Sequence, residues 1–520
     1  MIRRVGGRVL FGIACTLIAA LSVAIVVAVV IRSRPSSIRS RVARAVGLEL
    51  HLDTTIGGLS VRFRPHASLN ATDVALRIPG RGDVPPFVAI DRLSVEANPF
   101  RLASEILRGH VDAVHVEGLR ITIPPSSSED RPARAMLKST AGRSDIVIDD
   151  FVAENAVLTV LHRDPAHQPL VFHIHSLEMR DLGFGRPIPF RADLSNPIPE
   201  GEVHSEGSVG PWKSSPSDLP LQGTYRFRHA DLDTIAGIGG LLTSDGTYGG
   251  TLGSLRVDGQ TDAPNFNLDM GGKAVPLATR FSAVVNGSNG TTRLESVDAT
   301  LFDTTVHVTG DIVNLPGPRG FDISLTAAVA HGHIEDVLAL VMDTARPPFT
   351  GDVSLTSTIR LPAGPTPVHD RLVIDAAFAL TTARFTDGEV ERKIETLSWR
   401  GRGQDADLPM SRVATNVNGR LHLGANRISF SSLAFEVPGA TVRLQGTYEL
   451  RDSAMALEGQ LRTQASLSNV VGGFKSLFIK PFDWLFRRDG AGAVIPIRIE
   501  GTRDHPQFGV RIGAALTRGK

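Results

Sequence analysis

Apolar and polar residues alternate along residues 419–461, and this pattern recurs through most of the chain. A β-strand turns successive side chains to opposite faces, so the alternation predicts strands with one apolar and one polar face. Turn-forming residues at 424–426, 438–439 and 451–453 divide the segment at spacings that suit short turns. The alternating apolar residues are Leu421, Leu423, Ile428, Phe430, Leu433, Phe435, Val437, Val442, Leu444, Tyr448 and Leu450. The segment is therefore predicted to be a meander of antiparallel strands.

The same alternation predicts strands from residue 48 almost to the C-terminus. The clearest are 48–56, 59–63, 67–78, 87–97, 109–123, 146–151, 156–162, 169–178, 202–209, 306–313, 442–450 and 497–509. Short amphipathic helices are expected near 99–107, at 232–242 and from about His333 to Met342. So few helices cannot cover a long sheet, which must then curl upon itself. We predict a mainly β protein, an elongated and twisted antiparallel sheet of about 18 to 22 strands that is curled into a hydrophobic groove, on the order of 90 to 100 Å long.

The N-terminal segment has a different pattern. Residues 9–31 contain no charged residue and, as a helix, would be about 34 Å long, enough to span a bilayer core of roughly 30 Å. A cleaved signal peptide is the alternative, but the apolar stretch is long and no small-residue cleavage pattern follows it. Arginines flank both sides of the segment, so the distribution of positive charge leaves its orientation open.

Residues 35–47 predict a basic amphipathic helix that begins near Ser36 or Ser37 and ends at Gly47. Such a helix suits either a membrane surface or a position capping the first strands.

The order of motifs in the first part of the chain resembles the AsmA-like family of the bacterial envelope. An apolar anchor and a basic helix are followed by a GxLxVRFxPxxSLxxxDVxL run at 58–76, a VAIDRLSVExNPFRL run at 88–102 and a GHVDxVxVEGLRI run at 109–121. Units with the pattern Gly-x-x-x-x-Pro-x-Phe, at 259–266 and 501–508, resemble the repeating and C-terminal region of that family.

The resemblance implies a bridge-like lipid-transfer fold, a protein anchored in the inner membrane by a single span, and a function in outer-membrane lipid balance. It also implies a division into a cytoplasmic N-terminus (1–8), the transmembrane helix (9–31), an N-terminal β-region (35–125), a flexible loop (126–145), a repetitive β-groove (146–466), an amphipathic helical segment (467–490) and C-terminal strands (491–520), with the bulk of the chain in the periplasm. The partners it implies are phospholipids, the inner membrane and a periplasmic or outer-membrane protein. A second function seen in the family is non-enzymatic assembly of outer-membrane proteins, for which an open sheet edge is a natural pairing template.

A groove lined by aliphatic and aromatic residues would accept acyl chains, because each CH₂ removed from water contributes roughly 0.8 kcal/mol. The candidate lining residues are Phe430, Leu433, Phe435, Val442 and Leu444. Alternation alone does not say which face of the sheet is concave, and the adjacent pair Leu433 and Ala434 permits a bulge that resets the register.

Residues 467–490 gather aromatic side chains that are scarce elsewhere, with basic residues around them. The candidate contact residues are Phe474, Phe478, Phe482, Trp484 and Phe486. Pro481 divides the segment into two short helices. An aromatic face with basic flanks suits contact with a membrane or a partner protein, and the same residues also suit a plug at the end of the groove.

Composition and motifs argue against several classes of function and of binding site. The net charge of +1 and the absence of a basic, aromatic-interleaved patch argue against nucleic acid. The single cysteine, Cys15, lies in the apolar N-terminal segment, so no disulfide is expected. No nucleophile elbow, phosphate-binding loop, metalloprotease or dinucleotide motif is present, so we expect neither an enzyme nor a cofactor. His173 and His175, with His162 and His167 across a predicted hairpin, are the best metal candidates, but without a distinct carboxylate or cysteine partner they favour a solvated strand face.

Overall fold

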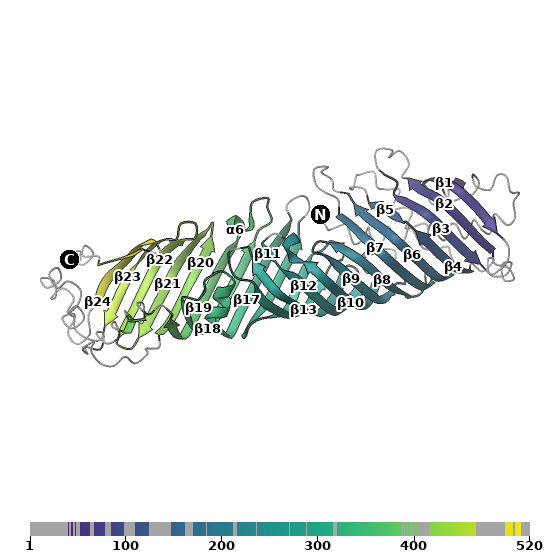
Figure 1. Cartoon of the computed structure of the whole chain (residues 1–520). Coiled ribbons are helices and arrows are strands. Elements are labelled where there is room, and N and C mark those ends of the chain that lie inside the picture. Colours follow the sequence, from purple (N-terminus) through teal and green to yellow (C-terminus); the bar gives the residue numbers. More distant parts are fainter. Residues whose placement is uncertain are drawn as a thin grey trace.

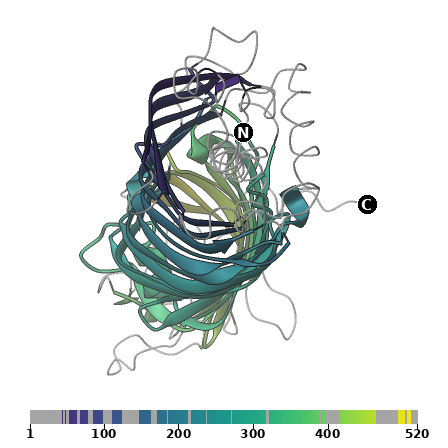
Figure 2. The same ribbon diagram turned by 90° about the vertical axis from the view of Figure 1, so that its right-hand side faces the viewer.

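The protein, described by a computed structural model, is mainly β and is built on one large mixed sheet of 25 strands. The structure describes residues 52–62, 67–77, 85–97, 110–123, 147–161, 170–183, 185–211, 216–235, 237–269, 271–287, 289–315, 320–386, 415–463, 494–502 and 505–510, with scattered positions in 40–47 and 388–402. The body is elongated, with β1 near one end and β24 near the other (Figure 1), and the strands curve around its long axis (Figure 2).

The strands follow one another closely along the chain. The first thirteen are β1 (Asp53–Arg62), β2 (Ala67–Arg77), β3 (Val88–Ala97), β4 (His110–Glu117), β5 (Arg120–Ile123), β6 (Val147–Val160), β7 (Leu170–Leu182), β8 (Ile188–Pro197), β9 (Glu200–Val209), β10 (Pro220–Asp231), β11 (Ile238–Gly239), β12 (Leu241–Thr251) and β13 (Ser254–Leu268). The remainder are β14 (Val275–Val285), β15 (Thr292–Leu301), β16 (Thr304–Asn314), β17 (Phe321–His333), β18 (Phe349–Leu361), β19 (Val373–Phe385), β20 (Thr415–Gly424), β21 (Arg427–Val437), β22 (Ala440–Glu449), β23 (Ala454–Thr463), β24 (Val494–Thr502) and β25 (Pro506–Val510).

Pairing is antiparallel between sequence neighbours along almost all of the sheet. The exception is β6, which runs parallel to β4 and β5. Parallel neighbours need a long crossover connection, and residues 124–146, which lie outside the described part, provide it. The prediction of a wholly antiparallel sheet was therefore wrong at this one place.

Two pairs of predicted strands are single strands in the structure. Residues 48–56 and 59–63 fall largely within β1, and 146–151 and 156–162 fall within β6. In β6 the buried residues change from Phe151 and Ala153 to Ala156 and Leu158, with Asn155 at a positive φ of 53° between them. A local backbone irregularity thus shifts the alternation without ending the strand. In the sequence, this shift of the alternation looks the same as a turn between two separate strands.

Helices are few among the described residues: η3 (Pro216–Asp218), η4 (Leu232–Thr234), α5 (Ile334–Ala339) and α6 (Val368–Arg371), with helical backbone also at positions 388, 391, 392, 394, 395 and 398. The predicted helix at 232–242 was wrong beyond its first turn: η4 ends at Thr234, and Ile235 already has extended backbone. Gly237 and Gly240, with positive φ values of 96° and 113°, then flank the short strand β11. The helix predicted to reach Met342 is confined to α5. Ser40, Ala43, Arg44 and Gly47 have helical backbone within the predicted basic helix.

Some predicted segments lie outside the described residues: the N-terminal span 9–31, the helix near 99–107, the loop 126–145 and the segment 467–490. None of the helices in the described part of the chain is both long and apolar enough to cross a bilayer.

Two hydrophobic clusters stabilise the sheet. The first joins β1–β10 and includes the fully buried side chains of Ile148, Phe151 and Val116. The second joins β16–β24 and includes Val353, Leu380 and Leu444. Helix α5 packs on the second cluster through Ile334 and Val337.

Gly446 occupies a position that no other residue fits. Its φ is +145°, and a Cβ there would lie 2.0 Å from the carbonyl oxygen of Ala456 on the neighbouring strand. We expect Gly446→Ala to lower the free energy of unfolding by about 1–3 kcal/mol, because both the positive φ and the contact of the added Cβ with the Ala456 carbonyl oxygen are unfavourable. The measurement is the thermal unfolding midpoint. Gly249→Ala is the control, since its Cβ would meet no atom closer than 4.0 Å; equal losses in both variants would contradict the prediction.

Candidate functional site

The two faces of the sheet differ in chemistry and in exposure. In β20, Thr415, Val417 and Gly419 are buried, whereas the residues between them are exposed. In β23, Met455, Leu457, Gly459 and Leu461 are half-buried and the intervening Ala456, Glu458, Gln460 and Arg462 are exposed. We call the more shielded side, which carries Val417 and Leu457, the apolar face and the other side the polar face.

One row of side chains crosses the apolar face from β2 to β24. It takes one residue from every strand in that span except β5 and β11, each aligned with the next by strand pairing. The first row is Leu69, Val95, Val114, Phe151, Met179, Phe190, Gly207, Gly223, Tyr248, Val257, Ala283, Leu294, Gly310, Leu325, Ile359, Ile374, Leu423, Ile428, Tyr448, Met455 and Gly501. None of these residues is charged.

A second row runs beside the first on the same face, usually two residues away in each strand. It is Ala71, Leu93, Val116, Ala153, Leu177, Ala192, Ser205, Tyr225, Gly246, Gly259, Phe281, Val297, Val308, Ala327, Ser357, Ala376, Leu421, Phe430, Gly446, Leu457 and Ile499. This row is also uncharged. The uncharged strip spans about 20 inter-strand steps of roughly 4.8 Å, close to 100 Å.

The five predicted lining residues lie together on the apolar face. Leu433 of β21 pairs with Leu444 of β22, and Phe435 pairs with Val442. All five, Phe430 included, belong to or pack against the second hydrophobic cluster. A bulge brings Phe430 to the same face as Leu433, and the register shift falls between these two residues, not at the predicted Leu433–Ala434 pair. The predicted contact residues at 474–486 lie outside the described residues.

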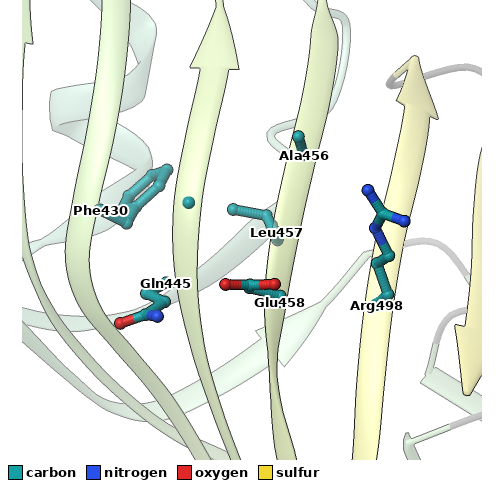
Figure 3. Close-up of a pocket in the computed structure, with 7 residues that line it drawn as sticks. Phe430, Gln445, Ala456, Leu457, Glu458 and Arg498 are labelled. Carbon is teal, nitrogen blue, oxygen red and sulfur yellow. The ribbon is translucent and has the colours of Figure 1, made fainter. Parts of the chain in front are cut away.

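Figure 3 shows Phe430 and Leu457 on the strands that flank β22. Between them in the second row is Gly446, which has no side chain, and a depression of about 350 Å³ opens there. Gln445, Glu458 and Arg498 of the polar face also line it. A second depression of about 530 Å³ lies beside Asp375, Arg420 and His422. Gly446 thus leaves a recess between the larger side chains of Phe430 and Leu457.

Sequence reasoning missed a group of hydroxyl-bearing residues that lies midway along the apolar face. Gly-Thr-Tyr occurs at 223–225, 246–248 and 446–448, and these triplets hold all three tyrosines of the chain. The first two triplets pair with each other, so that Tyr248 lies opposite Gly223 and Tyr225 lies opposite Gly246. The recurring triplet was the available signal, but its self-pairing depends on a register that the sequence does not reveal.

Each tyrosine ring of this pair lies over the glycines of neighbouring strands. A Cβ at Gly223 would lie 2.6 Å from Tyr248 Oη, and one at Gly246 would lie 2.7 Å from Tyr225 Cε1. Tyr248 Oη is 2.7 Å from Ser205 Oγ, and Tyr225 Oη is 3.0 Å from Ser244 Oγ. Burial raises the pKa of both tyrosines above the ordinary value, so both are protonated at neutral pH.

The polar face carries cross-strand ion pairs. Arg228 forms a bidentate pair with Asp245, with N–O distances of 2.9 and 3.0 Å, and Arg120 forms another with Asp91. These pairs are largely exposed, so each contributes little to stability, but they keep this side of the sheet in water. The candidate His175 contacts Ser195 Oγ at 2.8 Å. No group of potential ligands with metal-binding geometry occurs among the described residues.

His204 lies between two carboxylates on this face, 2.6 Å from Asp193 and 3.0 Å from Glu206. The hydrogen bond with Asp193 is the main reason that the pKa of His204 is raised above 6.5. The hydrogen bond with His204 is also the main reason that the pKa of Asp193 lies below 3.8 and that of Glu206 below 4.5.

These shifts predict a pH window. The contribution of His204 to stability is complete below pH 6.5 and is lost as pH rises through its folded pKa, whereas that of the carboxylates is present above their ordinary values and is lost in acid. His204→Gln should therefore destabilise most between about pH 4.5 and 6.5, by about 0.2–1 kcal/mol for the screened His204–Asp193 pair. Thermal midpoints from pH 4 to 9 measure this; a loss that is equally large at pH 9 would contradict it.

No model of a known protein family matches this chain. A search of curated proteins likewise finds no significant match.

Proposed function

We propose that this chain binds phospholipids and transfers them along the apolar face, which forms the lining of an open hydrophobic groove. One observation carries the proposal: two uncharged rows continue from β2 to β24 without a charged interruption. An isolated pocket needs only a short apolar patch, whereas an uncharged strip of about 100 Å suits cargo that moves along it. Its side chains are buried from β2 to β7 and mostly half-buried from β9 onward, so the strip is more open toward β24. The curvature of the strands around the long axis (Figure 2) supports placing the more shielded, apolar face on the concave side.

The energetics favour acyl chains as cargo. Each CH₂ removed from water contributes roughly 0.8 kcal/mol, so half of the about fifteen methylenes of one acyl chain would contribute on the order of 6 kcal/mol. The half-buried side chains of Phe430, Leu457 and Ile499 have apolar surface available for such contacts. A polar or charged ligand would find no ionic partner in the two rows.

The proposed location follows the resemblance to AsmA-like proteins. The segment 9–31 anchors the chain in the inner membrane with its N-terminus in the cytoplasm, and the sheet extends into the periplasm toward the outer membrane. The residues Phe474, Phe478, Phe482, Trp484 and Phe486 contact a membrane or a partner protein at the far end. No reaction and no cofactor belong to this proposal.

The second candidate is a scaffold that helps to assemble outer-membrane proteins. It draws on the sheet edges: among the described strands, β1 pairs only with β2 and so lies at an edge of the sheet. At the other end, β25 is short and begins with Pro506, which makes it a poor template. This role needs a free edge but not an apolar strip along the whole sheet.

Lipid transfer between vesicles tests the main proposal. The full chain is added to donor vesicles that contain fluorescent, quenched phosphatidylethanolamine and to unlabelled acceptor vesicles. We expect dequenching to accelerate in proportion to protein concentration. A rate equal to that without protein would overturn the transfer function.

A further inference from the structure

The hydroxyl hydrogens of Tyr225 and Tyr248 are both used in hydrogen bonds to serine oxygens, and this determines what the two phenol oxygens can still bind. Ser205 Oγ donates its only hydrogen to the carbonyl oxygen of Thr224 at 3.0 Å, so the hydrogen in its contact with Tyr248 comes from the tyrosine. Ser244 Oγ likewise donates to the carbonyl oxygen of Gln260 at 3.0 Å, so Tyr225 donates to Ser244. Both phenol oxygens therefore have committed hydrogens and retain acceptor lone pairs.

The pair lies among glycines and further hydroxyl groups on this face, with Val257 and Phe281 on its β13–β14 side. The glycine pairs Gly207–Gly223 and Gly246–Gly259 stand beside the tyrosines in the two rows. Thr261 and Thr279 add a further hydroxyl pair on the same face, with their oxygens 2.5 Å apart. This hydroxyl-bearing zone extends across β9, β10, β12, β13 and β14, four inter-strand steps or roughly 19 Å.

The position of this zone is as important as its composition. The cluster on its N-terminal side reaches the zone through Val209 of β9 and Leu221 of β10, and the cluster on its C-terminal side begins at β16. Between them, the lone pairs of Tyr225 and Tyr248 can be satisfied by water but not by an acyl chain, and burying an unsatisfied polar group is unfavourable.

We propose that Tyr225 and Tyr248 keep a hydrated crossing in the groove and thereby separate it into two acyl-chain compartments. Phospholipid occupies the two apolar stretches, and passage over the tyrosine pair limits the rate of transfer. This inference rests on the proposed lipid function and adds to it the residues that divide the groove and set the rate.

The test is a double variant, Tyr225→Phe with Tyr248→Phe, in the full chain. Phenylalanine keeps the ring over the glycines and removes only the oxygens, so the crossing becomes apolar. We expect vesicle transfer to be several-fold faster and native mass spectrometry to find at least one more phospholipid bound per chain. Thr247→Val is the matched control, because it removes a hydroxyl from the exposed polar face of β12, between Gly246 and Tyr248, and should change neither quantity.

The outcomes separate the two proposals. If wild type and double variant bind and transfer lipid equally, the crossing is disproved and the lipid function stands. If Thr247→Val has the same effect as the double variant, the effect belongs to any lost hydroxyl in this part of the sheet and the crossing is again disproved. If neither protein carries lipid, the proposed function fails and this inference fails with it. Circular dichroism and thermal midpoints close to those of wild type establish that the variants are folded.

Discussion

Leu457→Asp is expected to reduce phospholipid binding at least tenfold while the sheet remains folded. Leu457 lies on β23 in the second row, half-buried, between Gly446 of β22 and Ile499 of β24. A carboxylate there would have to lose its hydration when an acyl chain covers it, and neither row contains a cation to compensate. Arg498, which lines the same depression, lies on the polar face and already forms an ion pair with Glu500. A loss of only about 1.4 kcal/mol of binding free energy is a tenfold change.

The control for this variant is Gln460→Asp on the same strand. Gln460 is exposed on the polar face opposite Arg443, so a carboxylate there meets water and a cation. Both variants add one negative charge to β23, and only one adds it to the apolar face. Binding of radiolabelled phospholipid to the purified full chain is the measurement. Equal binding by the two variants would disprove the assignment of the lipid-binding face.

Of the substitutions proposed for this chain, Phe151→Ala should lower the free energy of unfolding most. Phe151 is only 1% exposed and belongs to the first row, in the cluster that joins β1–β10. Removing a buried phenyl ring leaves a cavity and costs about 3–5 kcal/mol. Because each strand of the elongated sheet contacts mainly its neighbours, we expect the loss to be local.

Hydrogen exchange measures where the loss occurs. Amides of β4, β6 and β7 should lose protection in Phe151→Ala, whereas those of β20–β23 should keep it. Phe151→Leu, which retains most of the buried volume, should show a smaller change at the same amides. An equal loss of protection in β20–β23 would show that the sheet unfolds as one unit and would contradict the prediction.

The alternation of apolar and polar residues was sufficient to predict a mainly β protein and to group the five lining residues on one face. This worked because strand pairing aligns residues two apart in each strand into continuous rows, as Leu433 with Leu444 and Phe435 with Val442 illustrate. The strand number was underestimated, since 25 strands are present, and segments such as β18 and β19 carry threonine, serine and alanine that weaken the pattern.

The remaining errors in the predicted elements have two kinds of cause, one local in the sequence and one not. Asn155 adopts a positive φ inside β6, and the shifted alternation looked like two strands. The helix that the apolar spacing had suggested ends at Thr234, because Ile235 is extended and the chain continues into β11 and β12. The parallel pairing of β6 and the hydrogen-bonded tyrosine pair depend on which strands become neighbours, and this information is not local in the sequence. The paired Gly-Thr-Tyr triplets became recognisable only when the register placed Tyr225 opposite Gly246.

The most direct test of the central claim is lipid analysis of the purified full chain. Wild type and Leu457→Asp are prepared side by side in the same mild detergent, and bound lipid is extracted and measured by mass spectrometry, with native spectra to count lipids per chain. The account predicts phospholipid on the wild type well above the level on the variant. A folded wild-type chain with no more phospholipid than Leu457→Asp would contradict it and would favour the scaffold role.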